Sequence, residues 1–493
     1  MDEQRWVDAG RWAERAAEAA EAFLANDVGF QDPSLFSTMK SLIQMTRRWE
    51  QGKAMVLGAG VVPVGQLQAE ARELVEVRTA LEGTPPSEEA EQREFLNVLT
   101  EWFKVSFFRW VDSPTCDYCA GATVLEAQVP PNEEERGFLA SRTEAYRCNR
   151  CGNITRFPRY NDPVKLLETR RGRCGEWANG FGAVATALGI RTRAVQDFAD
   201  HVWNECLVAG RWIHVDPCEG IVDRPMLYES GWGKAVRRVV GADPLGVRDC
   251  TKRYSRKAEE DVMFGICCDA YTRYMREGLT GEELASLRRI DEDEEADMEM
   301  VREVPGEVLP GRTTGSAAWR QQRGEVGNGE TASVCTRYRV VRFSEGAPLA
   351  GMRCASRASG ENAPGETSDK AFDGRVVSKW LCFEKDGAWL ELRLLDEEVS
   401  IASYSLTSAN DEPCRDPADW RVEMRGEDGE WVIVDRRKNI EFGSRGDTKA
   451  FEVRPGSLRM GKEIRLVIER VRAPAEANSV QISRFDIVPG TRK

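Results

Sequence analysis

Cys174 lies in the stretch RRGRCGEWAN, between Gly172 and Gly175. The residues that follow it, GEWANGFGAVATALG, carry apolar side chains at helical spacing, and Gly189 is placed to end that helix. A thiol at the start of a helix lies near the positive end of the helix dipole and near unpaired backbone N–H groups. Both lower the pKa of the thiol and favour the thiolate. The same N–H groups can hold an oxyanion, so we expect Cys174 to be a nucleophile.

A cysteine nucleophile needs a base, and the chain contains only two histidines, His201 and His214. Both occur in DHVWNECLVAGRWIHVDP, which we interpret as two strands joined by a two-residue turn at Ala209-Gly210. Such a turn places on one side of the ribbon the side chains of His201, Trp203, His214 and Asp216. An imidazole and a carboxylate are then close enough to act as a base and its orienting acid. The spacing alone does not choose between the two histidines.

Two C-x-x-C pairs precede the nucleophile, Cys116 with Cys119 and Cys148 with Cys151. Each pair can present two thiolates from one tight turn, and two such turns complete the tetrahedral four-sulfur shell that zinc prefers. A closed shell leaves no position for substrate or water. We therefore expect a structural Zn²⁺ that stabilises a lobe with little core of its own.

Charge and composition exclude several classes of protein. The formal net charge of −13 disfavours a protein that binds nucleic acid by neutralising phosphates. The start MDEQRWVDAG lacks the features of a signal peptide, and no apolar run is long enough for a membrane span. We therefore expect an intracellular protein without a membrane span. Of its 14 cysteines, we expect the clustered ones to serve metal binding or catalysis rather than disulfides, and most of the scattered ones to be inert buried side chains.

The pattern along the chain predicts four parts. Helical spacing in RWAERAAEAAEAFL and LFSTMKSLIQMTRRW indicates a helical N-terminal region. The acidic run from Arg289 to Glu307 is typical of a solvated helix end or linker. Short alternating runs such as WLELRL, EWVIVD and EIRLVIERV indicate a C-terminal β-sandwich. The predicted parts are a helical region at 1–93, a catalytic core with the zinc lobe at 94–280, an acidic linker and core-closing segment at 281–330, and the sandwich at 331–493.

A resemblance to a known family is carried by RFPRYNDPVKLLETRRGRCGEWAN, DHVWNE, RWIHVDPCEG and RPMLYESGWGK. These stretches are similar to those of cytoplasmic peptide:N-glycanases, the peptide-N4-(N-acetyl-β-glucosaminyl)asparagine amidases of the transglutaminase-like superfamily. The resemblance runs from about Glu94 through Tyr254. The later GRTTGSAAWRQQRGE, Gly311 to Glu325, resembles the family's segment that closes the core. The C-terminal part is similar to discoidin-like domains of the galactose-binding type.

The resemblance implies an α+β fold with a transglutaminase-like, papain-like core, and it assigns roles to particular residues. It makes Cys174 the nucleophile, His201 the base and Asp216 the orienting acid. It makes Cys116, Cys119, Cys148 and Cys151 the zinc ligands. It also implies substrate contacts by Glu219 in DPCE and, in the cleft wall, by Trp203 and Trp212, although the two tryptophans are as typical of a hydrophobic core.

The activity that the resemblance implies is hydrolysis of the amide between an N-glycan and Asn in misfolded or denatured glycoproteins. It converts Asn to Asp through a thioester. The implied location is cytoplasmic, with the nucleus as the alternative. A link to proteasome or ubiquitin-shuttle proteins stays open, because residues 1–93 show no match to the family's ubiquitin-pathway adaptor domain.

Two alternatives fit parts of the same pattern. Another transglutaminase-like acyl-transfer enzyme or a cysteine protease uses the same activated thiol. A non-catalytic scaffold, of the kind that DNA-repair proteins build from this fold, would bind duplexes. The acidic net charge and the presence of Cys174, His201 and Asp216 argue against the scaffold.

Overall fold

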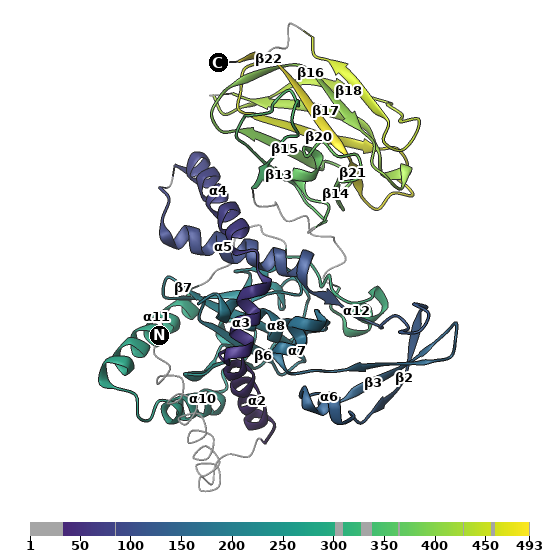
Figure 1. The fold of residues 1–493 in the computed structure, drawn as a ribbon. Helices are drawn as coiled ribbons and strands as arrows, with labels where there is room; N and C mark the ends of the chain where they lie inside the picture. The colour runs from purple at the N-terminus through teal and green to yellow at the C-terminus, as the bar shows by residue number, and fades with distance from the viewer. Residues whose placement is uncertain are drawn as a thin grey trace. The chain divides into compact units, whose positions relative to one another are not determined.

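The computed structural model describes residues 33–83, 85–300, 309–326, 338–362, 365–426, 428–454 and 459–492 (Figure 1). These residues divide into two compact units. The first contains the described residues of the ranges Met1–Val64, Leu99–Pro305 and Gly311–Asn328, and the second those of Gly65–Val98, Gly306–Pro310 and Gly329–Lys493. The helix predicted in RWAERAAEAAEAFL lies outside the described residues. The finer division into four parts stays a prediction.

The first unit is built on a six-stranded antiparallel sheet with the order β11-β10-β6-β7-β8-β9. Nearly every residue of β6, β7 and β8 is buried, so elements of this unit cover both faces of the sheet. The strands are β6 (Thr192–Asp197), β7 (His201–Val208), β8 (Arg211–Asp216), β9 (Ile221–Val222), β10 (Val239–Asp243) and β11 (Gly246–Asp249).

Helix α8 (Cys174–Ala187) is the central helix of this unit and contacts β6 and β7 (Figure 1). It begins at Cys174, as its apolar spacing predicts. Helix α2 (Pro33–Trp49) crosses it so closely that a Cβ on Gly182 would lie 2.3 Å from the Trp49 ring. The Trp49 indole N–H donates to Asn179 Oδ1 at 2.7 Å, which fixes the two helices together. The helices nearby are α3 (Gly52–Val61), α7 (Pro163–Thr169) and α9 (Thr251–Tyr254), with the π-helical turn η1 (Phe103–Phe107) and the 3₁₀ turn η2 (Pro225–Leu227).

The two C-x-x-C pairs belong to a small lobe of the same unit. Its sheet has the order β2-β3-β4, and its one short helix lies between the first two strands. Strand β2 is exposed along most of its length, so the lobe has little apolar core. The elements are β2 (Thr123–Val129), α6 (Glu133–Gly137), β3 (Thr143–Cys148) and β4 (Ile154–Pro158).

The described part of the acidic segment, up to Met300, is a helix, and its packing on the sheet corrects the expectation that the segment is solvated. Helix α11 (Gly281–Glu299) contacts β8 and buries the carboxylates of Glu294 and Asp297. Their partners are the buried guanidinium groups of Arg193 and Arg253. Charge density alone could not reveal this pairing, because both arginines precede the helix in the chain and lie in other elements. Helices α10 (Val262–Met275) and α12 (Ala317–Arg323) complete the described helices of the unit.

The second unit contains a β-sandwich, as predicted. One sheet has the order β12-β13-β15-β20-β17-β18, the facing sheet has the order β19-β16-β22, and a two-stranded ladder joins β14 to β21. One hydrophobic core draws on Leu390, Val422 and Ile464 from the first sheet and on Ile401 and Phe485 from the second. The elements are β12 (Arg339–Val341), β13 (Cys354–Ala358), η3 (Ser368–Ala371), β14 (Trp380–Cys382), β15 (Trp389–Leu394), β16 (Val399–Thr407), η4 (Pro413–Arg415), β17 (Pro417–Arg425), β18 (Trp431–Arg437), β19 (Thr448–Glu452), β20 (Glu463–Val471), β21 (Val480–Ile482) and β22 (Arg484–Arg492).

The second unit also contains the segment Gly65–Val98, which holds nearly all of helix α4 (Val64–Glu82) and most of helix α5 (Glu88–Trp102). The hydroxyl of Ser87 accepts from the backbone N–H of Ala90 at 3.1 Å, so it caps the N-terminus of α5. None of the helices that the structure describes is both long and apolar enough to cross a membrane. None of the cysteines in the described part of the chain forms a disulfide.

The buried ion pairs of α11 lead to a stability prediction. Burial disfavours the ionised form of Glu294, but the charges of Arg193 and Arg253 outweigh it and hold the pKa below its usual value. Glu294→Gln should therefore lower the free energy of unfolding by about 3 kcal/mol at pH 7, since it leaves two buried cations short of a partner. Urea unfolding measures the loss, and hydrogen exchange of α11 peptides locates it.

The control is Glu292→Gln, because Glu292 is exposed on the same helix. Because the folded pKa of Glu294 lies below the unfolded value of about 4.3, its contribution is present above that pH and is lost as the pH falls. Equal stability of the two variants at pH 7 would contradict the prediction.

Candidate active site

The nucleophile's helix begins in a constrained turn. Arg173 has extended backbone angles, and its backbone N–H donates to Glu176 Oε2 at 3.0 Å, which ties the residue before the helix to its first turn. A Cβ on Gly172 would lie 2.3 Å from the Cβ of Glu176, so a side chain is excluded there. No atom lies within 4 Å of a Cβ built on Gly175, and Cys174 itself is half-buried. The thiol is therefore held at the first helical position and remains accessible.

Two arginines connect this turn to the cysteine-bearing lobe. The Arg173 side chain donates to both carboxylate oxygens of Glu144 on β3, at 3.1 and 2.8 Å, and to the Tyr146 hydroxyl at 2.9 Å. Arg159, just after β4, donates to both oxygens of Glu176 at 2.6 and 2.8 Å. The lobe and the start of α8 are thus one hydrogen-bonded assembly, and the position of the lobe bears on the position of Cys174.

Strands β7 and β8 form the predicted hairpin. The turn residues Ala209 and Gly210 have φ values of 49° and 81°, as a two-residue turn of this twist requires. Val208 pairs with Arg211 and Glu205 pairs with His214, which is the predicted register. One face of the ribbon therefore carries His201, Trp203, Glu205, His214 and Asp216.

Asp216 holds His201 through a buried hydrogen bond. His201 Nε2 lies 2.8 Å from Asp216 Oδ2, and both side chains are 0% exposed. The other oxygen of Asp216 accepts from the backbone N–H groups of Cys218 and Glu219 at 3.0 and 3.2 Å. Because Nε2 is engaged by the carboxylate, only Nδ1 of the ring is left for Cys174. This nitrogen is buried and makes no hydrogen bond in the structure.

His214 has a different partner, which separates the roles of the two histidines. Its Nε2 lies 2.9 Å from the hydroxyl of Tyr228, and that hydroxyl lies 3.0 Å from Asp216 Oδ2. The hydroxyl has one proton, which it donates to the carboxylate, so it must accept from an N–H at Nε2. The Nδ1 of His214 accepts from the backbone N–H of Arg224 at 3.3 Å. Burial lowers the pKa of His214 to about 3, in agreement with this neutral tautomer.

The electrostatics of Cys174 and His201 favour a thiolate beside an imidazolium. Burial raises the pKa of the thiol, but the neighbouring His201 and its charge outweigh it, and the net shift is downward. Burial lowers the pKa of His201, but the charge and hydrogen bond of Asp216 outweigh it and raise the pKa to about 9. At neutral pH the pair therefore holds a nucleophile and a proton ready for a leaving group.

The structure buries both Trp203 and Trp212, while the substrate contact expected of them stays a prediction. Trp203 is 0% exposed and stacks on His201, with ring centroids 5.6 Å apart. Trp212 is 3% exposed, and the Arg193 guanidinium lies 4.3 Å from its ring centroid. Spacing shows which strand face carries a side chain, but it does not show what covers that face.

The carboxylate of Glu219 binds two residues that are distant in the chain. Its Oε2 accepts from the backbone N–H and hydroxyl of Thr313 at 2.9 and 2.5 Å. Its Oε1 accepts from the same two groups of Thr314 at 3.2 and 2.5 Å. A carboxylate has about four acceptor positions, and these four donors occupy them. In the structure, Glu219 thus holds the segment predicted to close the core, and the substrate contact that the resemblance implies stays a prediction.

Two residues of the site were missed by the sequence analysis, although the stretches that contain them were noted. Tyr228 lies in RPMLYESGWGK, and its hydroxyl joins His214 to Asp216. Arg312 lies in GRTTGSAAWRQQRGE, and its charge lowers the pKa of Cys174. Neither shows a local pattern that marks it, because each acts on residues distant in the chain.

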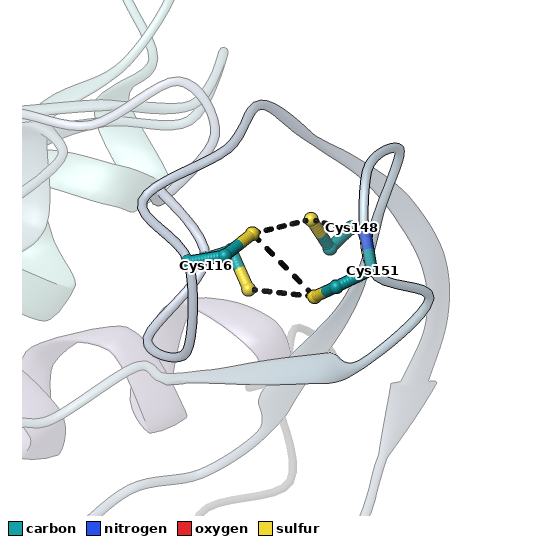
Figure 2. A group of neighbouring side chains, drawn as sticks. Cys116, Cys148 and Cys151 are labelled. Atoms are coloured by element: carbon teal, nitrogen blue, oxygen red, sulfur yellow. Dashed lines mark hydrogen bonds between the residues drawn. The ribbon is translucent and has the colours of Figure 1, made fainter.

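The two C-x-x-C pairs form one cluster, and Figure 2 shows their sulfur atoms turned toward one another from facing loops. Cys151 Sγ lies 3.5 Å from the sulfurs of both Cys116 and Cys119, and Cys148 Sγ lies 3.5 Å from that of Cys119. A Cβ on Gly121 would lie 3.2 Å from two of the sulfurs, so this glycine keeps the space beside the cluster free. The cluster can hold a metal ion.

Comparison with known proteins gives a match to the transglutaminase-like superfamily over residues 125–217, which contain Cys174, His201 and Asp216. The peptide-N(4)-(N-acetyl-beta-glucosaminyl)asparagine amidase of Saccharomyces cerevisiae is 40% identical over 254 residues, covering 46% of this chain and 69% of that protein. The protein of the same name from Yarrowia lipolytica is 41% identical over 243 residues, covering 47% of this chain and 68% of that protein.

The chain belongs to this amidase family. The Arabidopsis thaliana amidase is 41% identical over 298 residues, which are 57% of this chain and 40% of that protein. The chain spans about half the length of the first curated relatives that it matches. Both this chain and its relatives therefore contain residues outside the part that they share.

The C-terminal sheets resemble carbohydrate-binding domains of the F5/8 type C kind. An F5/8 type C domain from Bacteroides fragilis has a TM-score of 0.24 and 16% identity, covering 30% of this chain and 95% of that chain. A family 32 carbohydrate-binding module of Clostridium perfringens, solved with galactose, has a TM-score of 0.23 and 12% identity, covering 28% of this chain and 93% of that chain.

The thiolate–imidazolium pair predicts a pH dependence for Cys174. Its alkylation by iodoacetamide should already be fast at pH 7, because the pKa of the thiol is lowered. His201→Asn removes the cation that lowers the pKa, so alkylation at pH 7 should slow by about tenfold. Peptide mapping by mass spectrometry measures the rate at each pH.

Cys206 serves as the internal control, because burial raises the pKa of its thiol to about 12. Cys206 should remain unmodified at every pH measured, both in the unsubstituted protein and in His201→Asn. An unchanged rate at Cys174 in His201→Asn would show that the two side chains do not interact in solution.

Proposed function

We propose that the protein is an amidase that hydrolyses the bond between an N-glycan and Asn in unfolded glycoproteins or glycopeptides. The observation that supports it most is the buried pair of His201 and Asp216 beside a half-buried Cys174 at the start of α8. These residues lie in a chain of the amidase family, whose members are named for this reaction. The roles are nucleophile for Cys174, base and acid for His201, and orienting acid for Asp216.

The first step is attack by the Cys174 thiolate on the carbonyl carbon of the glycosylated Asn side chain. A sulfur–carbon bond forms, and the π electrons of the carbonyl move onto its oxygen. The backbone N–H groups at the start of α8 lie where they can stabilise that charge. Asp216 keeps the His201 ring oriented while the ring is positively charged.

The second step breaks the carbon–nitrogen bond. The proton on His201 passes to the departing nitrogen, so the glycan leaves as a neutral glycosylamine, and a thioester remains on Cys174. His201, now neutral, takes a proton from water as the water attacks the thioester. The peptide is released with Asp in place of Asn, and the thiol is restored.

The proposal places the reaction in the cytosol, where the substrates are unfolded glycoproteins. A link to proteasome or ubiquitin-shuttle proteins stays a prediction. A transglutaminase or a cysteine protease would use the same thiol, and each has its own product. Incorporation of an amine, or cleavage of the peptide backbone without glycan release, would support those activities.

We also propose that the four-cysteine cluster holds a structural zinc ion. The sulfur separations of 3.5 Å are close to the roughly 3.8 Å expected when four sulfurs surround zinc at about 2.3 Å each. Backbone N–H groups of Cys151 and Arg150 lie 3.4 and 3.3 Å from Cys148 Sγ and lower the pKa of that thiol, which favours the thiolate that zinc binds. When bound, the ion would cross-link the two loops. It would have no open coordination position for substrate or water.

The amidase proposal predicts the outcome of a single substitution. Cys174→Ala should abolish glycan release from a denatured N-glycoprotein, a loss of at least about 1,000-fold, because no other group can form the thioester. Mass spectrometry should show a gain of about one dalton at the former glycosylation site with the unsubstituted protein only. Cys267→Ala, which removes a partly exposed thiol of α10, is the control and should retain activity. Glycan release by Cys174→Ala would rule out the thioester.

The zinc proposal predicts a coupled loss of metal and activity. Cys148→Ser should lower the bound zinc from one equivalent and reduce glycan release, because a loose lobe no longer holds Glu144 against Arg173. Elemental analysis gives the zinc content. Cys354→Ser, at a buried free thiol in the β-sandwich, is the control and should retain the metal. Full zinc content in Cys148→Ser would contradict the assignment of the ligands.

A further inference from the structure

Arg312 lies between the elements that carry the nucleophile and the base. Its guanidinium is 5.5 Å from the ring centroid of Trp110 on β1 (Arg109–Trp110) and 4.7 Å from that of Trp232. Trp110 pairs with Gly172 of β5 (Arg171–Gly172), two residues before Cys174. Trp232 packs on the ring of His201, with centroids 5.0 Å apart. The two tryptophans therefore hold the arginine beside both reacting side chains.

The guanidinium has one donor group without a partner. Nη1 donates to Glu325 Oε2 at 2.8 Å and Nε donates to Thr314 Oγ1 at 3.2 Å. Nη2 is buried and makes no hydrogen bond, although the Arg312 side chain is only 1% exposed. A buried, charged donor without an acceptor is unfavourable. Such a group calls for an explanation, and in an active site an acceptor on the bound substrate is one.

The charge of Arg312 acts on the reacting groups. It lowers the pKa of Cys174 after the larger effects of burial and of His201, and it partly opposes the rise in the pKa of His201. In return, the thiolate is among the groups that raise the pKa of Arg312 against the effect of burial. A positive charge fixed at this place stabilises negative charge on the sulfur and on any oxygen bonded next to it.

The segment that carries Arg312 is held by Glu219. The four hydrogen bonds from Thr313 and Thr314 to this carboxylate fix the backbone directly after Arg312. Glu219 follows Asp216 by three residues, and its own backbone N–H donates to Asp216 Oδ1 at 3.2 Å. Arg312 is therefore positioned from the same turn that holds the orienting acid.

We propose that Arg312 is a further catalytic residue: its Nη2 group donates to the carbonyl oxygen of the scissile amide as that oxygen becomes anionic, and Glu219 is its positioning residue. This inference rests on the proposed amidase function. When the Cys174 thiolate bonds to the carbonyl carbon, the π pair moves to the oxygen, and the N–H of Arg312 stabilises it without transferring its proton. As the oxygen reforms the double bond, the carbon–nitrogen bond breaks, and the departing nitrogen takes its proton from His201.

The experiment compares Arg312→Gln and Arg312→Lys with Arg323→Gln in the full chain. Arg323 is the matched control, because it also pairs with Glu325, at 3.0 Å, and lies over the Trp319 ring that Arg312 contacts. Glycan release from a denatured glycopeptide gives kcat and KM. Alkylation of Cys174 by iodoacetamide across pH gives the titration of the thiol without any substrate, and thermal unfolding reports the fold.

Arg312→Gln should lower kcat by about 100-fold or more with little change in KM, as loss of a donor to an oxyanion does. It should also move the alkylation midpoint of Cys174 to higher pH, because a cation is lost. Arg312→Lys should keep that midpoint but remain low in kcat, since an ammonium cannot reproduce the planar fork. Arg323→Gln should change kcat by no more than about threefold and should leave the alkylation midpoint of Cys174 in place, because its ion pair is partly exposed. If Arg312→Gln does not fold, the kcat of Arg312→Lys is the measurement that decides.

A kcat within about threefold of the unsubstituted value in a folded Arg312 variant would overturn the inference, and so would an equal loss in Arg323→Gln. If the unsubstituted protein released no glycan, the proposed function would fail, and the alkylation profiles would still test the effect of Arg312 on Cys174. Glu219→Gln, which replaces one acceptor oxygen by a donor, should reproduce the loss in kcat of Arg312→Gln. An unchanged kcat in that variant would overturn the positioning role.

Discussion

The geometry and the charges of the candidate active site depend on the carboxylate of Asp216. It has four partners, namely His201, the Tyr228 hydroxyl and two backbone N–H groups of the following turn. These donors keep its pKa low in spite of burial, so the carboxylate stays charged in the interior. That single charge orients His201, keeps its pKa high, and through it favours the thiolate of Cys174. Without it, the thiol and the imidazole would be two neutral side chains in contact.

The nucleophile depends on a second assembly, which reaches it from the cysteine-bearing lobe. Glu144 and Tyr146 lie on β3, the strand that ends at Cys148, and both contact Arg173. The four-cysteine cluster and the thiol of Cys174 are thus joined through one strand and one arginine. The geometry of the cluster can therefore affect the position of Cys174 without any direct contact between them.

The sequence predicts best where a local rule determines the geometry. The two-residue turn at Ala209 and Gly210 sets the strand register, so the shared face of His201 and Asp216 follows from spacing. The start of α8 follows from its apolar periodicity, and the cysteine cluster follows from the doubled C-x-x-C pattern. In each case the residues that determine the geometry are close in the chain, or they are cysteines in a recognisable spacing.

The sequence predicts poorly where the decisive contact joins distant segments. The burial of Glu294 depends on Arg193, and the partners of Glu219 are Thr313 and Thr314. An acidic run looks the same whether it faces water or two buried arginines. The burial of Trp203 is likewise decided by what packs over the hairpin, including Tyr228 and Tyr254.

The bonds between Glu219 and Thr313 span 94 residues of chain. During synthesis on the ribosome, the cysteine, histidine and aspartate emerge long before the loop that Glu219 holds. Until that loop arrives, the Glu219 carboxylate has no such partners, and the guanidinium that faces the thiol is absent. A nascent chain can therefore adopt the hairpin and α8 early, while the complete reaction centre forms only when translation has passed Glu325, late in the growth of the first unit.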